Sequence, residues 1–98
     1  MRESMNMGGA VVSRNILEKK GTLKWCLREE PVTPVDNGWR FFSDIDDQEF
    51  LSDPSNMCIC DWGTVVEIEP AVMEIFDMPI GTDISLENEN GRKYFMEQ

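Results

Sequence analysis

Asp36-Asn37-Gly38-Trp39-Arg40-Phe41-Phe42-Ser43 joins a turn sequence to a run of strand-forming residues. Asp, Asn and Gly favour turns because they bond their own backbone or tolerate positive φ. Aromatic residues favour strands, where side chains alternate between the two faces. The pattern therefore predicts a strand over residues 39–43 with Trp39 and Phe41 in the core. An alternative places Trp39 and Arg40 at a binding surface, because both residue types are enriched in interface hot spots.

Two further strands are predicted on the amino-terminal side of this stretch. The first is the apolar run 10–13, and the second is residues 23–29. In the second strand, alternation puts Leu23, Trp25 and Leu27 on one face and Lys24, Cys26 and Arg28 on the other. Residues 15–20 predict a short helical turn that ends at a glycine. Residues 1–7 are expected to form a flexible leader, followed by a single domain over residues 8–98.

On the carboxyl-terminal side, short helices and strands are mixed. The acidic residues 44–53 predict a short helix that is capped by Ser43 or Asp44 and stopped by Pro54. We expect a strand over 57–62, a strand or the start of a helix over 64–68, and a helix over 71–76. Strands 84–86 and 93–96 are joined by a hairpin turn containing Asn-Gly. The fold class is therefore α+β, a small single domain with short, mostly antiparallel strands and one or two short helices.

Composition excludes several classes of function. The 98 residues include 19 acidic and 9 basic side chains, a net charge of −10, and no histidine. Nucleic-acid binders and polybasic membrane anchors need clustered Lys and Arg. The net negative charge of this chain argues against both classes. A chain without histidine has no Ser-His-Asp triad and no His-containing zinc site. No apolar run approaches the roughly 20 residues that span a bilayer. We therefore expect a binding protein without catalytic residues or a cofactor.

The negative charge is concentrated in the second part of the chain. Residues 1–40 carry seven basic and five acidic side chains, a net +2, whereas residues 41–98 carry two and fourteen, a net −12. No basic residue lies between Phe41 and Gly91. One interpretation is a solvated surface that keeps a small protein soluble. The other is a negative face that steers a basic partner toward it.

The cysteines and the acidic cluster invite metal-site interpretations that the spacing does not favour. Three cysteines, with Cys58 and Cys60 one residue apart, form no disulfide framework and indicate a reducing cytoplasm. Core packing is the favoured role for Cys58 and Cys60, with a redox or metal role as the alternative. A calcium loop starting at Asp44 would need Gly and Glu where Glu49 and Ser55 stand. No metal ligands are assigned, and a looser calcium site stays an alternative.

Several blocks of the sequence together carry a family resemblance. They are residues 9–14, Trp25 with residues 28–31, residues 36–43, the acidic segment 46–56 with its Asp-Pro, and residues 79–82. This pattern resembles the immunity protein 33 family of bacterial polymorphic-toxin systems, over about residues 8–86. The resemblance implies a small α+β domain that binds and neutralises a cognate toxin, and it brings no catalytic residues.

The leading hypothesis is a non-enzymatic, cytoplasmic protein that occludes a basic protein partner, a toxin domain, through its acidic segment. The predicted contact residues are Trp39, Asp44, Asp46, Asp47, Glu49, Asp53, Asp61 and Trp62. The alternative hypothesis is a stand-alone regulatory or small-ligand-binding domain without a toxin partner. A carboxylate-based or metal-dependent enzyme is a third. The sequence leaves the oligomeric state open.

Overall fold

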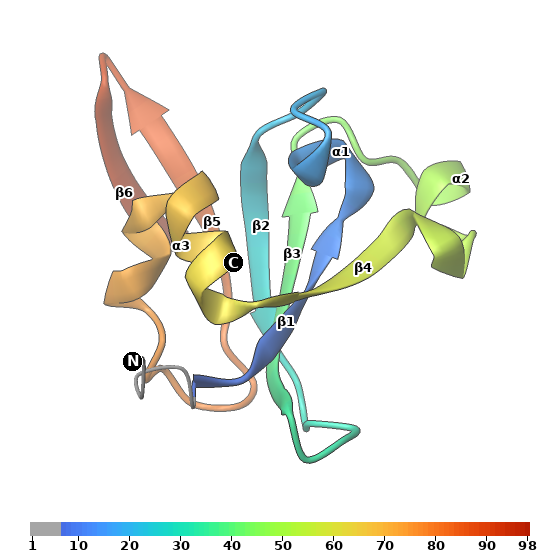
Figure 1. The fold of residues 1–98 in the computed structure, drawn as a ribbon. Helices are drawn as coiled ribbons and strands as arrows, with labels where there is room; N and C mark the ends of the chain where they lie inside the picture. The colour runs from blue at the N-terminus through green and yellow to red at the C-terminus, as the bar shows by residue number, and fades with distance from the viewer. Residues whose placement is uncertain (1–6) are drawn as a thin grey trace.

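Six strands form one mixed sheet in the order β4-β1-β3-β2-β5-β6 (Figure 1). The computed structural model describes residues 7–98, so the expected leader lies outside it apart from Met7. The elements in chain order are β1 (Gly9–Ser13), α1 (Arg14–Leu17), β2 (Leu23–Arg28), β3 (Asp36–Ser43), α2 (Gln48–Leu51), η2 (Pro54–Asn56), β4 (Met57–Asp61), α3 (Trp62–Ile68), η3 (Pro70–Glu74), β5 (Asp83–Glu89) and β6 (Arg92–Glu97). This arrangement confirms the α+β class.

The centre of the sheet is a parallel pair, β1 and β3, in which Val11 lies opposite Arg40 and Val12 opposite Phe41. Every other neighbouring pair is antiparallel, as expected. Parallel neighbours need a crossover, and here α1 and β2 provide it. The hairpin between β5 and β6 turns at Asn90 and Gly91, both at positive φ, as the Asn-Gly pair predicts.

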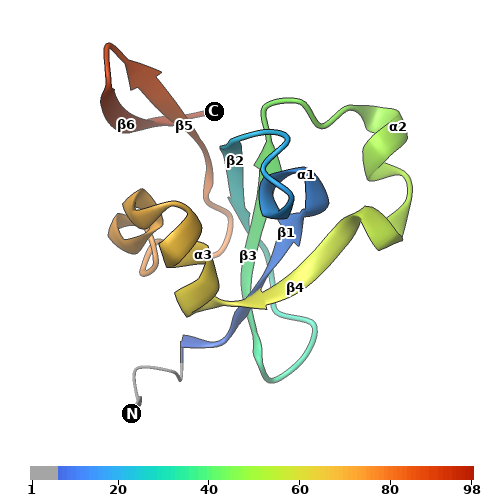
Figure 2. The same cartoon turned by 45° about the horizontal axis from the view of Figure 1, so that its top comes forward.

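An aromatic cluster joins the helical layer to one face of the sheet. The rings of Trp39 and Phe41 on β3 stack 5.8 Å apart, and each lies within 6.4 Å of the Trp62 ring at the start of α3. Phe76 meets Trp62 edge-on at 4.9 Å. Figures 1 and 2 show α1, α3 and η3 on this same side of the sheet. The core therefore lies between these helices and one sheet face, called here the covered face.

A bulge in β2 changes which of its side chains reach the core. Leu23 lies opposite Ser43 but Trp25 lies opposite Phe42, so Lys24 is an extra residue in the ladder. The bulge shifts the alternation by one position. Leu23 and Cys26 are buried on the covered face, whereas Trp25 is 39% exposed on the opposite face. The predicted grouping of Leu23 with Trp25 is therefore wrong.

Two elements differ from the expected ones. The predicted strand over 57–62 ends one residue early, at Asp61, and of the two alternatives for residues 64–68 the structure has the helix, α3. Asp61 accepts a hydrogen bond from the backbone N–H of Thr64 and caps this helix. The following turn is a 3₁₀ helix, η3, that begins at Pro70. It buries Val72, and Ile75 just beyond it is 2% exposed. The helix predicted over 71–76 is therefore a shorter 3₁₀ turn, and Val72 and Ile75 face the core.

β3 begins at Asp36, earlier than predicted, because Gly38 lets the chain stay in the sheet. Gly38 has a φ of +91°. A Cβ at this position would lie 2.3 Å from the carbonyl oxygen of Glu29. Only glycine fits so close to the end of β2. The expected turn is therefore an irregular strand start.

Arg28 links the end of β2 to the chain segment after η3. Its guanidinium donates hydrogen bonds to the backbone oxygens of Asn37 (3.0 Å), Phe76 (3.0 Å) and Met78 (2.7 Å). It also lies 5.6 Å from the Trp39 ring centroid and 5.8 Å from that of Phe76. This side chain therefore fixes the covering layer beside the aromatic cluster.

We predict that Arg28→Lys lowers the free energy of unfolding by about 1–3 kcal/mol, because an ammonium cannot reach three separated carbonyls from one plane. Urea unfolding at pH 7 measures the loss. Arg14→Lys is the control. Among residues 7–98, Arg14 makes one ion pair, which is exposed, with Glu18, so this substitution should change stability by less than about 0.5 kcal/mol. Equal effects of the two substitutions would contradict this role for Arg28.

Candidate functional site

The predicted acidic contact residues do not form a single cluster. Asp44, Asp47, Glu49 and Asp53 are exposed on the connection between β3 and β4, which carries α2 and η2 (Figure 1). Asp61 is exposed at the opposite end of β4, beside Gly9 of β1. The structure thus keeps four of the six predicted acids exposed on one connection and separates Asp61 from them by the length of a strand. The sixth, Asp46, is half-buried on the same connection.

Most of these acids also cap helices. The Asp47 carboxylate accepts a hydrogen bond from the backbone N–H of Phe50 at 2.8 Å, which begins α2. Asp53 accepts from the N–H and hydroxyl of Ser55, which begins η2, and Asp61 caps α3. These hydrogen bonds hold the pKa of Asp53 and Asp61 below the usual range. Capping is thus one role of these side chains, and the cap of α2 is Asp47 rather than the predicted Ser43 or Asp44.

The Asp46 side chain connects β1, α1 and the end of β3 through hydrogen bonds. It accepts hydrogen bonds from the Ser13 hydroxyl at 2.9 Å, the Asn15 amide at 2.8 Å, and the backbone N–H of Ser43 at 2.8 Å. The Ser43 hydroxyl is a fourth donor. Partial burial raises the pKa of Asp46, but the hydrogen bonds outweigh it and hold the pKa below its ordinary value of 3.8. Its carboxylate is engaged by the protein itself, so it ties α1 to the end of β3.

The surface around α2 combines negative charge with exposed aliphatic side chains. Ile45 is 52% exposed and Leu51 is 37% exposed, and both lie among the acids. Within residues 7–98, the Glu49 carboxylate has no hydrogen-bond donor. We call this region the α2 surface, defined by Asp44, Ile45, Asp47, Glu49, Leu51 and Asp53.

The two tryptophans among the predicted contact residues are buried. Trp39 is 0% exposed and Trp62 is 3% exposed, and both belong to the aromatic cluster of the core. Neither has side-chain surface to offer a partner, so the predicted anchoring role does not fit this structure. The exposed tryptophan is Trp25, which the sequence pattern had placed beside Leu23.

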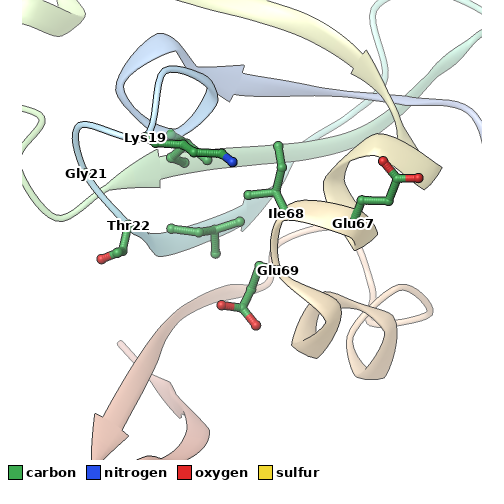
Figure 3. A pocket seen from close by; sticks show the side chains of 8 residues that line it. Lys19, Gly21, Thr22, Glu67, Ile68 and Glu69 are labelled. Atoms are coloured by element: carbon green, nitrogen blue, oxygen red, sulfur yellow. The ribbon is translucent and has the colours of Figure 1, made fainter.

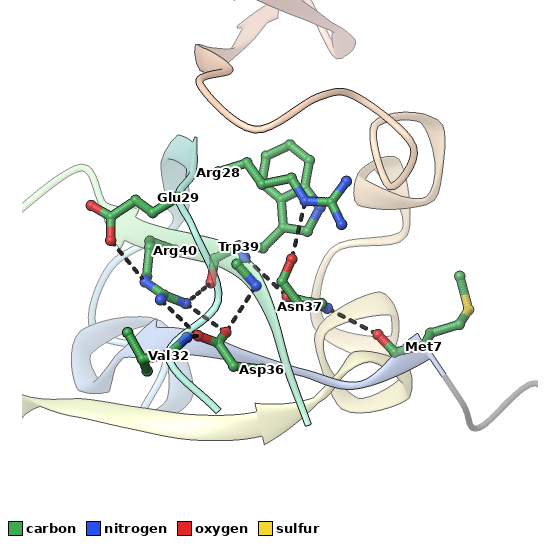
Figure 4. Close-up of polar contacts among 9 residues, drawn as sticks. Met7, Arg28, Glu29, Val32, Asp36, Asn37, Trp39 and Arg40 are labelled. Atoms are coloured by element: carbon green, nitrogen blue, oxygen red, sulfur yellow. Dashed lines mark hydrogen bonds and ion pairs between the residues drawn. The ribbon is translucent and has the colours of Figure 1, made fainter. Parts of the chain in front are cut away.

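Arg40 belongs to a polar network on the face of the sheet opposite the covered face (Figure 4). Its guanidinium donates two hydrogen bonds to Asp36, at 2.8 and 2.9 Å, and one to Glu29 at 3.2 Å. The Arg40 hydrogen bonds hold the pKa of Asp36 well below its usual range. Arg40 is only 8% exposed, and its positive charge is compensated by the carboxylates of Asp36 and Glu29.

The cysteines are arranged as packing residues. Cys58 and Cys60 lie opposite Val12 and Ala10 on the covered face, and Cys60 packs against the core. Burial raises the pKa of Cys60, and it raises the pKa of Cys26 to about 12. Among the described residues, no group of three or more Cys, Asp or Glu side chains could hold a metal ion.

A pocket of about 480 Å³ opens between the turn after α1 and the end of α3. In Figure 3, Lys19 extends across it toward Ile68, with Glu67 at its far side. Glu69 also lines it, and this carboxylate pairs with Lys93 at 2.7 Å. Charges of both signs thus line an open pocket, without a nucleophile paired to a base.

Comparison with protein families gives a match over nearly the whole chain. The family model described as "Immunity protein Imm33 domain" matches residues 10–97. The chain belongs to this immunity protein family. Searches of curated proteins and of solved structures found no significant match. Membership supports a toxin-directed role for this Imm33 domain, and the resemblance predicted from the sequence is confirmed. In the part of the chain that the structure describes, no helix is both long and apolar enough for a membrane crossing.

We predict that Asp46→Asn lowers the free energy of unfolding by about 1–3 kcal/mol at pH 7, because an amide accepts fewer of the four donors. Since the folded-state pKa of Asp46 is depressed, its contribution is complete above pH 3.8 and is lost as pH falls below that value. Urea unfolding at pH 7 and pH 3 should show a difference from wild type that shrinks at pH 3. Glu49→Gln is the control and should match wild type. A difference that is unchanged at pH 3 would contradict the assignment.

Proposed function

We propose that this Imm33 domain is a non-enzymatic immunity protein that neutralises a cognate toxin by binding it through the α2 surface. Membership of the immunity family supports a toxin as the partner. The carrying observation is the concentration of four exposed acids on one connection, in a chain segment without any basic residue from Phe41 to Gly91. Such a surface complements a basic protein.

The capping hydrogen bonds support this function because they fix the negative charges in place. Asp47 and Asp53 each bond a backbone N–H through one carboxylate oxygen, Oδ1. Charges held this way lose little conformational freedom on binding, which reduces the entropic cost of association. Ile45 and Leu51 supply apolar area between them. The expected mechanism is steered encounter followed by steric occlusion of the toxin.

A stand-alone ligand-binding role is the second candidate, and the pocket beside Lys19 is the observation that favours it. The pocket is open and lined by Lys19 and Glu67, whose opposite charges suit a small zwitterionic ligand more than a single ion. A gene far from any toxin or secretion locus would favour this candidate over the immunity role.

We predict that the double substitution Gln48→Lys and Glu49→Lys slows association with the cognate toxin domain by about tenfold at low salt. Both side chains are exposed, and neither caps a helix. The change adds two positive charges and removes one negative charge, a net change of +3, and should also flatten the salt dependence of the association rate. Biolayer interferometry between 20 and 300 mM NaCl measures both quantities.

Glu74→Lys is the matched control, because Glu74 is exposed on η3, away from the α2 surface. Its association rate should stay within about twofold of wild type. Absence of binding by the wild-type chain at low salt would refute the immunity function. Equal rates for the double variant and the control would refute the α2 surface as the contact.

A further inference from the structure

One side of the sheet has no covering layer among the described residues. Cross-strand partners share a face, and Val11, Arg40 and Leu27 lie opposite one another across β1, β3 and β2. Phe42, Trp25 and Ser85 form the next row, which Met96 extends onto β6. We call this side the open face. In Figures 1 and 2, the helices that pack on the sheet lie on its other side.

The open face is rich in apolar side chains that the core does not use. Trp25 is 39% exposed, Met96 46% and Ile59 77%. Val11, Leu27 and Phe42 between them are half-buried, and none of the six belongs to the core cluster of the described residues. Exposed apolar side chains gathered on one face of a small protein in this way mark an interaction site.

The middle of this face is electrically compensated. Arg40 lies between Val11 and Leu27, and its guanidinium is held by Asp36 and Glu29. The pairing leaves no free cation there to attract an anion. Lys24 lies over the Trp25 ring at 5.5 Å and pairs with Glu87 at 2.9 Å. A partner therefore meets an apolar centre on the open face, where the charged side chains are already paired with one another.

The rim of the open face is acidic, which decides the chemistry of the partner. The acids on this side are Glu29, Asp36, Asp61, Asp83, Glu87 and Glu89, and the bases are Lys24, Arg40 and Arg92, a net charge of −3. Among residues 7–98, Asp61 and Asp83 have no basic partner. A second copy would bring the same negative rim, so like charges would oppose self-association. The face therefore suits a basic protein.

Its size also suits a protein. Six strands spaced about 4.8 Å apart make a surface about 24 Å across, in a molecule with extents of 34 × 32 × 25 Å. Small molecules bind in concave pockets, whereas a sheet face is broad. Trp and Met are enriched, together with Tyr and Arg, at the centres of protein interfaces. Tyr94 on β6 adds a 42% exposed aromatic ring to this side.

We propose that the open face is the apolar contact of the toxin-binding surface, with Trp25 as its central residue and Asp61 and Asp83 at its rim. The partner is a protein that presents an apolar centre surrounded by Lys and Arg. This inference rests on the proposed immunity function and adds to it a contact that the α2 surface does not include.

The test compares Trp25→Thr and Met96→Thr with Met73→Thr. Threonine keeps the strand preference of both positions on the open face. Met73 is 64% exposed on η3, on the helical side of the sheet, and serves as the matched apolar control. The probe is the purified cognate toxin domain, and biolayer interferometry measures Kd. Thermal unfolding first checks that each variant folds like wild type.

We expect Trp25→Thr to weaken binding by at least about tenfold, mainly through a faster dissociation rate, and Met96→Thr by about threefold. Met73→Thr should stay within about twofold. If wild type binds and all three variants bind equally, the open face is not the contact, whereas the immunity function stands. If wild type does not bind, the immunity function itself fails, and this inference with it.

Tryptophan fluorescence gives an independent readout, since Trp39 and Trp62 are buried and Trp25 is exposed. Acrylamide should quench Trp25 in the free chain, and binding of the toxin domain should protect it. The signal of Trp25 is the difference between wild type and Trp25→Phe. Undiminished quenching of Trp25 in the complex would overturn the proposal. A dimer in light scattering of the free chain that Trp25→Thr converts to a monomer would overturn the choice of partner.

Discussion

Trp62 packs against Trp39, Phe41 and Phe76, and this contact fixes α3 and the segment after η3 to the sheet. Aromatic side chains bury large areas, so a few of them can hold short helices that would not be stable alone. A chain of 98 residues forms one core, and here that core occupies only the covered face. The asymmetry of the molecule, with one face packed and one face open, follows from where these rings point.

The parts of the fold that local patterns determine could be predicted from the sequence. The strand around Trp39 and the Asn-Gly hairpin depend on neighbouring residues and were predicted correctly. The parallel pairing of β1 with β3 is non-local and leaves no mark in either segment. The bulge at Lys24 depends on fitting β2 against β3, so the exposure of Trp25 could not be read from alternation. Exposure of most of the acids was predictable. Their division into helix caps, the engaged Asp46, and Glu49, which has no hydrogen-bond donor within residues 7–98, depends on the three-dimensional fold.

Acidic side chains cap helices in this chain, and the same side chains also place negative charge at the surface. Asp47 and Asp61 each complete the first turn of a helix while they remain at the surface. Helix starts favour acids because the backbone N–H groups there carry partial positive charge. A connection with several short helices therefore accumulates acids for structural reasons. This gives a physical route by which a stable small fold acquires a surface suited to a basic partner.

The position of β1 in the sheet constrains how the chain folds during synthesis. β1 is made first, but its two neighbours are β3 and β4, which follow tens of residues later. An isolated strand has no hydrogen-bonding partner of its own, and non-local pairings form slowly because they close long loops. The apolar residues Ala10 to Val12 thus remain uncovered until the chain has emerged past Asp61. β1 therefore gains both of its neighbours only after that point, and the sheet is complete only once β5 and β6 have followed.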